Sequence, residues 1–203
     1  MSMASLFSQP AAANEPLRLV VEVNEGVRQV IGVSRRVNLV AINAMIVAKQ
    51  AGRQASGFQV VSAELRRFSG QLDLQMQDLD RFIASLVHTV AGSARVRRHR
   101  AHLDAIDPKS PASAAIADAK QRIDTARRRI DDESAERWCD LRKHLDQALR
   151  LCGTGVALSR AAKIEAVYAS TLGGDLRQVA DEIEAAILSI LGILKTLRSD
   201  VAR

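Results

Sequence analysis

The sequence predicts an all-α protein: an antiparallel four-helix bundle with coiled-coil packing, made of two helical hairpins. Apolar residues recur at spacings of three and four along most of the 203 residues, which is the pattern of helices with one buried face. Aromatic residues make up only 3% of the chain, as expected where thin, regular helices interdigitate small aliphatic side chains. The prolines are Pro10, Pro16, Pro108 and Pro111, and they leave two long stretches without a helix breaker.

The first stretch predicts a hairpin over residues 17–103, with one helix over residues 17–51 and a second over residues 58–102. Gly52 can adopt the left-handed conformation that ends a helix, and Gly57 gives the chain freedom to begin the next one. The expected apolar seam consists of Val20, Val23, Val27, Val30, Val37, Ala41 and Ala44 before the turn, and Phe58, Val61, Leu65, Phe68, Leu72, Leu79, Phe82 and Leu86 after it. Two helices with such a seam pack antiparallel.

The second stretch predicts a hairpin over residues 113–203, after a polar connection that contains Pro108 and Pro111. Its first helix carries an apolar seam that slips by about one residue between Ile130 and Trp138, so a local irregularity or break is expected there. Gly173 and Gly174 mark the second turn, and the last helix is expected from Asp175 to the C-terminus. Both glycine turns should then lie at the same end of the bundle.

The domain organisation follows from these elements. Residues 1–15 are expected to form a disordered tail, and residues 16–203 a single helical domain. The second hairpin resembles a degenerate copy of the first, with Ile164 aligned to Ala44 and, after a two-residue deletion at the turn, Glu182 aligned to Glu64; whether it is a true duplication stays open. The mid-helix glycines Gly32, Gly153, Gly155 and Gly192 would share one level, where close helix packing is favoured over bending.

Residues 38–68 carry a run of residues with a recognisable order. They are Asn38, Leu39, Ala41, Asn43, Ala44, Ile46, Ala48, Ala51, Gly52, Gly57, Phe58, Val60, Val61, Glu64 and Arg66. This run resembles, without a gap, the hairpin tip of the cytoplasmic signalling domain of methyl-accepting chemotaxis proteins, the bacterial chemoreceptors. The resemblance implies a soluble signalling or adaptor module that acts by helix packing and is not an enzyme.

The same resemblance implies where partners would bind. Leu39, Ile42 and Val60 correspond to the surface for the coupling protein, and Asn43 and Ile46 to contacts between receptors. Gln50 stands where the family has an arginine of the tip. A chemotaxis histidine kinase, a coupling protein or a receptor is therefore the expected kind of partner, and self-association stays open.

The chain departs from the family in the charges of the tip. Val47 replaces a glutamate, Arg53 replaces a glutamate of the turn, Ser56 replaces an arginine, and Arg35 replaces an aromatic residue. Because these charges orient the family's contacts, the input signal, the actual partner and the choice between activator and decoy stay open.

Motifs for catalysis are absent from the sequence: it contains no phosphate-binding glycine loop, nucleophile elbow or zinc-type Cys and His cluster. No enzyme activity, cofactor, metal or small-molecule substrate is expected. Single aromatic residues such as Trp138 and Tyr168, and also Cys139, are interpreted as packing residues. The carboxylates of Asp181, Glu182 and Glu184, the best match to a methylation site, are interpreted as a solvated helix face.

Charge and hydropathy bear on the alternative function and on location. The net charge is +6, with arginine runs at residues 95–100 and 127–129, so the alternative is a basic helical scaffold that binds nucleic acid or an anionic membrane surface. Nucleic acid is not the partner expected on the leading hypothesis. The N-terminus lacks the features of a secretory signal, and the longest apolar run, residues 185–194, is too short to span a bilayer, so a cytoplasmic location is expected.

Overall fold

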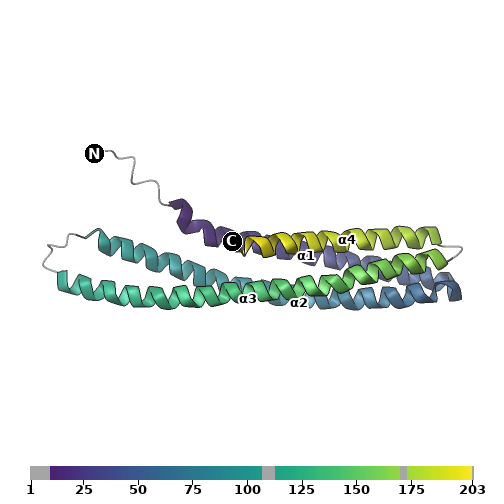
Figure 1. The fold of residues 1–203 in the computed structure, drawn as a ribbon, viewed down its shortest axis with the longest axis horizontal. Helices are drawn as coiled ribbons and strands as arrows, with labels where there is room; N and C mark the ends of the chain where they lie inside the picture. Colours follow the sequence, from purple (N-terminus) through teal and green to yellow (C-terminus); the bar gives the residue numbers. More distant parts are fainter. Residues whose placement is uncertain (1–9, 107–112, 170–172, 203) are drawn as a thin grey trace. The chain divides into compact units, whose positions relative to one another are not determined.

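The computed structural model describes residues 10–106, 113–169 and 173–202, and every element in them is helical (Figure 1). The elements are α1 (Pro10–Gln50), the short 3-10 helix η2 (Gly52–Ala55), α2 (Ser56–Asp104), α3 (Ser113–Tyr168) and α4 (Gly173–Asp200). Consecutive helices pack against each other in pairs. The prediction of an all-α bundle made of two hairpins is confirmed.

Contacts divide the chain into two compact units, each with residues from both hairpins. Unit 1 comprises Met1–Glu22 and Phe82–Leu141, and unit 2 comprises Val23–Arg81 and Arg142–Arg203. Unit 2 therefore holds parts of all four helices, whereas unit 1 holds parts of α1, α2 and α3 only. The assignment of residues 16–203 to one domain stays a prediction.

The start of the first helix and the continuity of the third differ from the sequence prediction. Helix α1 begins at Pro10, seven residues before the expected start at position 17, because Pro10 can occupy a first helical position and the alanines after it favour helix. Residues 1–9 of the predicted tail lie outside the described residues. A local irregularity or break was predicted between Ile130 and Trp138, and the break is wrong: α3 is one continuous helix. No proline or glycine interrupts it there, and slow rotation of the buried face can absorb a one-residue slip.

Unit 2 contains the main core, and its composition differs between helices that run in opposite directions. Near the tip, α1 and α3 contribute mostly alanines, whereas α2 and α4 contribute large side chains that fill the space between them. The buried residues of this region are Ala41, Ala44, Ala48, Ala162, Ala166, Ala169 and Ala180 among the small ones, and Phe58, Leu65, Leu176 and Ile183 among the large ones.

One constant shift of 118 residues superposes the buried positions of the first hairpin on those of the second. Val27, Val30 and Ser34 on α1 correspond to Leu145, Ala148 and Cys152 on α3, and all six are buried. The same shift continues through the turns, from Phe58 and Leu79 to Leu176 and Leu197. The predicted similarity of the two hairpins thus appears in their burial patterns. The predicted alignment needs one correction: there is no two-residue deletion at the turn, and Ala44 corresponds to Ala162 instead of Ile164.

The two turns lie at the same end of unit 2 (Figure 1). Gly52 has φ +70°, the left-handed conformation predicted for it, and η2 forms the turn. Gly57 lies within the first turn of α2, where an added Cβ would stand 1.9 Å from Oε2 of Glu165, near the end of α3. Gly173 and Gly174 open α4, and a Cβ on Gly173 would stand 3.1 Å from the carbonyl oxygen of Ala166; residues 170–172 of the predicted turn lie outside the described residues.

The prediction of close packing at the mid-helix glycines holds for one residue of the four. A Cβ on Gly155 would stand 2.5 Å from Cζ of Phe68, so this glycine admits the aromatic ring. Gly32, Gly153 and Gly192 are exposed, and nothing lies within 4 Å of the position that a Cβ would take. For these three residues the packing interpretation is wrong, because they are on the outer surface of their helices.

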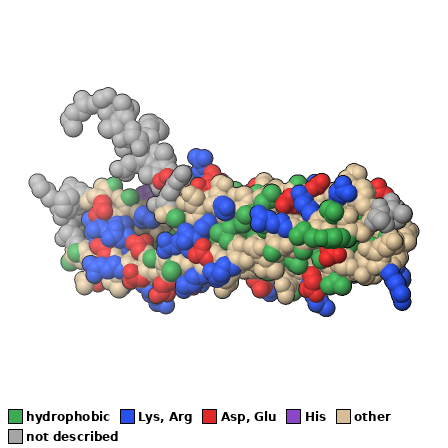
Figure 2. Space-filling model, turned by 45° about the vertical axis from the view of Figure 1, so that its right-hand side comes forward, with side chains coloured by type: hydrophobic (Ala, Val, Ile, Leu, Met, Phe, Trp, Pro, Cys, Tyr) green, Lys and Arg blue, Asp and Glu red, His purple; other side chains and the backbone are tan. Residues whose placement is uncertain are grey.

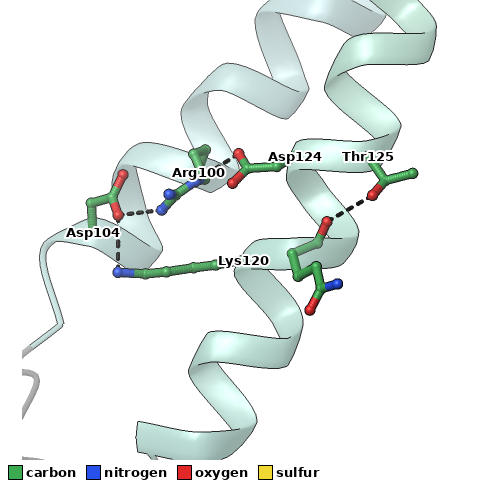
Figure 3. Close-up of polar contacts among 6 residues, drawn as sticks. Arg100, Asp104, Lys120, Asp124 and Thr125 are labelled. Atoms are coloured by element: carbon green, nitrogen blue, oxygen red, sulfur yellow. Dashed lines mark hydrogen bonds and ion pairs between the residues drawn. The ribbon is translucent and has the colours of Figure 1, made fainter.

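In unit 1, an ion-pair network joins the end of α2 to the beginning of α3 (Figure 3). Arg100 Nε lies 2.9 Å from Asp124 Oδ1, and Lys120 Nζ lies 2.9 Å from Asp104 Oδ1. Arg100 also pairs with Asp104, which links the two contacts into one network. The Lys120 ammonium and then the Arg100 guanidinium hold the pKa of Asp104 below its usual range, while burial opposes them.

This network predicts that the contact between the end of α2 and the beginning of α3 loosens in acid. A carboxyl group whose pKa is lowered by folding stabilises the folded form above its unfolded pKa, about 3.9, and that contribution is lost as the pH falls through the lower folded value. Hydrogen-exchange protection of the last turn of α2 should therefore fall below about pH 4. Asp104→Asn should have low protection at all pH values; a variant with the wild-type pH profile would contradict this role.

Helix α1 raises the question of a membrane span. Over residues Glu15–Gln50, α1 is long and apolar enough to cross a bilayer by length and composition. The sequence prediction considered only the apolar run at residues 185–194 and did not include this helix. A core helix meets the same criterion, and here Val30, Val37, Ala41, Ala44 and Ala48 are buried against the other helices of unit 2. Arg35 and Arg36 interrupt the apolar sequence halfway along. Of its most apolar window, 28% is buried, so the buried seam accounts for part of the hydropathy and exposed residues such as Leu39 and Ile46 account for the rest.

Candidate functional site: the tip of unit 2

Four of the predicted contact residues lie in one line on the outer face of α1. Leu39, Asn43, Ile46 and Gln50 follow each other at spacings of four, three and four residues, and all four are exposed. The buried seam at Ala41, Ala44 and Ala48 fixes the opposite face of the helix against the core. Leu39 is 62% exposed and Ile46 is 55% exposed, so two large aliphatic side chains of this face lie at the surface. We call these four residues the α1 tip stripe.

The two other predicted contact residues are placed differently. Ile42 is half-buried beside the stripe and takes part in the packing of α1. Val60 is on α2 and is 63% exposed. Its level along the hairpin is set by the neighbouring Gln59, whose Nε2 donates a hydrogen bond to the carbonyl oxygen of Ala48 at 3.0 Å. The structure therefore brings four of the six residues into one stripe, and adds Val60 on the adjacent helix at a similar level.

Two groups of charged residues near the tip form ion pairs. Arg67 pairs with Glu64 at 2.6 Å, and Lys163 bridges Asp181 at 2.7 Å and Glu184 at 2.5 Å, which joins α3 to α4. The hydrogen bonds that Lys163 donates to these two carboxylates, first to Asp181 and then to Glu184, raise its pKa. The α1 tip stripe itself carries no charged side chain, so its recognition chemistry is apolar contact with amide hydrogen bonds from Asn43 and Gln50.

The second hairpin has exposed apolar residues that the sequence analysis missed. Ile164, Val167 and Tyr168, near the end of α3, are 58%, 61% and 71% exposed. The interpretation of Tyr168 as a packing residue is wrong, because it corresponds to the exposed Gln50 by the 118-residue shift. The same shift matches Ile164 to Ile46. An alignment without the two-residue deletion would therefore have indicated from the sequence that Ile164 is exposed. Figure 2 shows hydrophobic side chains gathered among charged ones toward the right-hand end of the visible face.

The proposed aromatic packing is supported for Trp138, which is half-buried in unit 1. It lines a cavity of about 110 Å³ together with Pro16, Val90, Ser93, Arg97, Asp131 and Ser134. The polar groups there bind each other: Arg97 Nη1 donates to Ser93 Oγ at 3.0 Å, and Ser93 Oγ donates to Asp131 Oδ1 at 3.2 Å. Cys139 is half-buried on the same helix, whereas Tyr168 belongs to the other unit.

Reactive groups are not assembled in the part of the chain that the structure describes. No group of three His, Cys, Asp or Glu side chains that could hold a metal ion is found among those residues. Both cysteines are free thiols, and burial raises the pKa of Cys152 to about 11, so this thiol stays protonated at neutral pH. Asp181 and Glu182 are exposed, in agreement with the interpretation of a solvated face, but Asp181 and Glu184 also hold Lys163.

Comparison with known proteins gives one partial similarity. The chain is 32% identical over 72 residues to the “Putative sensory transducer protein YvaQ” of Bacillus subtilis (strain 168). The similarity covers 34% of this chain and 13% of that protein, so the chain spans about an eighth of the relative's length. No protein-family model and no solved structure matches the chain. The chain therefore contains a region similar to a sensory transducer protein, which is consistent with a signalling role.

Proposed function

We propose that this protein is a cytoplasmic, chemoreceptor-like signalling or adaptor module that works by helix packing and not by catalysis. The α1 tip stripe is the proposed contact surface, and a chemotaxis coupling protein, a histidine kinase or a receptor is the proposed partner. The similarity to a sensory transducer protein supports the signalling role. The observation that carries the proposal is the exposure of Leu39 and Ile46 on a helix whose opposite face is fully buried.

The buried face of α1 holds the α1 tip stripe in a fixed orientation. Ala41, Ala44 and Ala48 have no exposed surface, so α1 cannot rotate to bury Leu39 and Ile46 without losing its own core. When a partner covers exposed aliphatic side chains on a rigid helix, the free energy of the complex falls by about 25 cal/mol per Å² of apolar surface buried. The two amides of the stripe can fix the orientation of the partner helix.

The test is a binding measurement with purified coupling protein and histidine kinase, comparing Ile46→Asp with the intact protein. A carboxylate at the centre of an apolar contact should weaken binding at least tenfold, about 1.4 kcal/mol. Ile46 is preferable to Ile42 as a test position, because the half-buried Ile42 also supports folding.

Ile164→Asp provides the matched control, since Ile164 has the same side chain, a similar exposure and the corresponding place in the second hairpin. It should leave binding unchanged, and circular dichroism should show equal helix content for both variants. Binding that is insensitive to Ile46→Asp would refute the proposed surface. A partner that dissociates steeply with added salt would favour the alternative, phosphate-binding scaffold, because apolar contacts depend little on salt.

A further inference from the structure

The packing of unit 1 leaves an apolar seam incompletely covered. Between Ala94 and Asp140, none of the residues that the structure describes is buried, although aliphatic side chains recur there at intervals of seven. Val96 and Leu103 on α2 and Ile116, Ile123 and Ile130 on α3 are all half-buried. We call these five residues the open seam. Two helices alone cannot bury a seam as four helices do in unit 2.

Polar layers interrupt the open seam and set its register. Ser93 on α2 is paired with Asp131 on α3, and Arg100, seven residues later, is paired with Asp124, seven residues earlier. The levels between these pairs are occupied by Arg95, Arg97 and Arg98 on α2 and by Arg127–129 on α3. The structure thus brings two arginine runs, one from each hairpin and about 30 residues apart in sequence, to the same level of the α2–α3 helix pair.

These arginines can form ion pairs with a partner. Arg95, Arg98, Arg127, Arg128 and Arg129 are exposed, and among the described residues none of them has a carboxylate within ion-pair distance. Arg97 donates to a serine hydroxyl. Lys and Arg side chains are dense over the left-hand part of the face in Figure 2, the end where α2 finishes and α3 begins in Figure 1.

We infer that this arginine-flanked open seam is a docking surface for an acidic amphipathic helix of a partner protein. Such a helix would cover the aliphatic side chains with its apolar face and pair its carboxylates with the unpaired guanidinium groups. Residues 94–104 of α2 extend over about 16 Å, so the bound segment needs about three helical turns. This surface belongs to unit 1 and is separate from the α1 tip stripe.

Charge and composition favour this occupant over two others. A second copy related by a twofold axis would place identical arginine runs near each other, and like charges at an interface are unfavourable. Nucleic acid would satisfy the arginines but leave the open seam in water. Unit 1 also presents no exposed aromatic side chain on which a single-stranded nucleic acid could stack, since Phe82 and Trp138, the aromatic residues of unit 1 that the structure describes, are half-buried.

The probe for this inference is a synthetic helical peptide of about 21 residues with leucines at heptad a and d positions and glutamates beside them. A scrambled peptide of the same composition keeps the charge and removes the apolar face. The full-length protein should bind the first peptide at least tenfold more tightly than the second. Equal binding of the two peptides, or no binding of either, would overturn the inference.

Charge-reversal variants locate the site. Arg98→Glu combined with Arg128→Glu should weaken peptide binding at least tenfold. Arg36→Glu combined with Arg160→Glu makes the same change of net charge on exposed arginines of unit 2, and should change binding twofold or less. Equal losses in both pairs would show a nonspecific charge effect and reject the site.

The remaining outcomes separate other occupants and the proposed function. Duplex DNA that binds more tightly than the peptide and with the same dependence on Arg98 and Arg128 would assign the surface to nucleic acid. Dimers in sedimentation that Leu103→Glu dissociates would assign it to a second copy. Either result overturns the inference. Ile46→Asp should bind the peptide normally, so failure here and failure of the tip contact are distinguishable.

Discussion

Replacing Phe68 by alanine is expected to lower the free energy of unfolding by about 3–5 kcal/mol, the usual loss for a buried aromatic side chain. Phe68 is 2% exposed, and its ring on α2 lies against Gly155 of α3, so it joins the two hairpins within unit 2. Its removal takes away apolar burial and leaves a cavity between two rigid helices. Urea unfolding, followed by circular dichroism, measures the loss.

The control for this substitution is Leu74→Ala on the same helix. Leu74 is 63% exposed, so its truncation should change the free energy of unfolding by less than about 0.5 kcal/mol. A loss below about 1 kcal/mol for Phe68→Ala would mean that the hairpins do not share this core. Equal losses for the two variants would contradict the burial of Phe68.

Replacing either of two nearby glycines of α3 by alanine should change the free energy of unfolding in opposite directions. Gly155→Ala is expected to destabilise unit 2 by about 1–3 kcal/mol, because the new Cβ would stand 2.5 Å from a phenyl ring that the core prevents from moving away. Gly153→Ala should stabilise it by about 0.5–1 kcal/mol, because that position is open and alanine favours helix. Chemical unfolding of both variants gives the two signs.

A double-mutant cycle tests the cause of the first effect. In the Phe68→Ala background the ring is absent, so Gly155→Ala should become neutral or stabilising. If Gly155→Ala still destabilises without the ring, the contact with Phe68 is not the reason. If Gly153→Ala destabilises in the intact protein, position 153 is packed and its exposure is refuted.

Helical periodicity, together with the positions of the glycines and prolines, was sufficient to predict the all-α class, the two hairpins and the first turn. Apolar residues at spacings of three and four leave little freedom in which face of a helix is buried, so Val27, Ala44 and Leu72 are buried as their spacing requires. Gly52 takes the left-handed conformation because a residue without Cβ is the one that adopts it at low cost. The same local rules place Leu39 and Ile46 on the outer face of α1.

Long-range packing decided the features that local patterns cannot contain. Whether a glycine is needed depends on what approaches it from another helix: Gly155 meets Phe68, whereas Gly153 meets nothing. The exposure of Tyr168 depends on where α3 ends. The two arginine runs lie at one level because of the register of α2 against α3, which the pairs Ser93–Asp131 and Arg100–Asp124 set. Neighbours in space, and not neighbours in the chain, determine each of these properties.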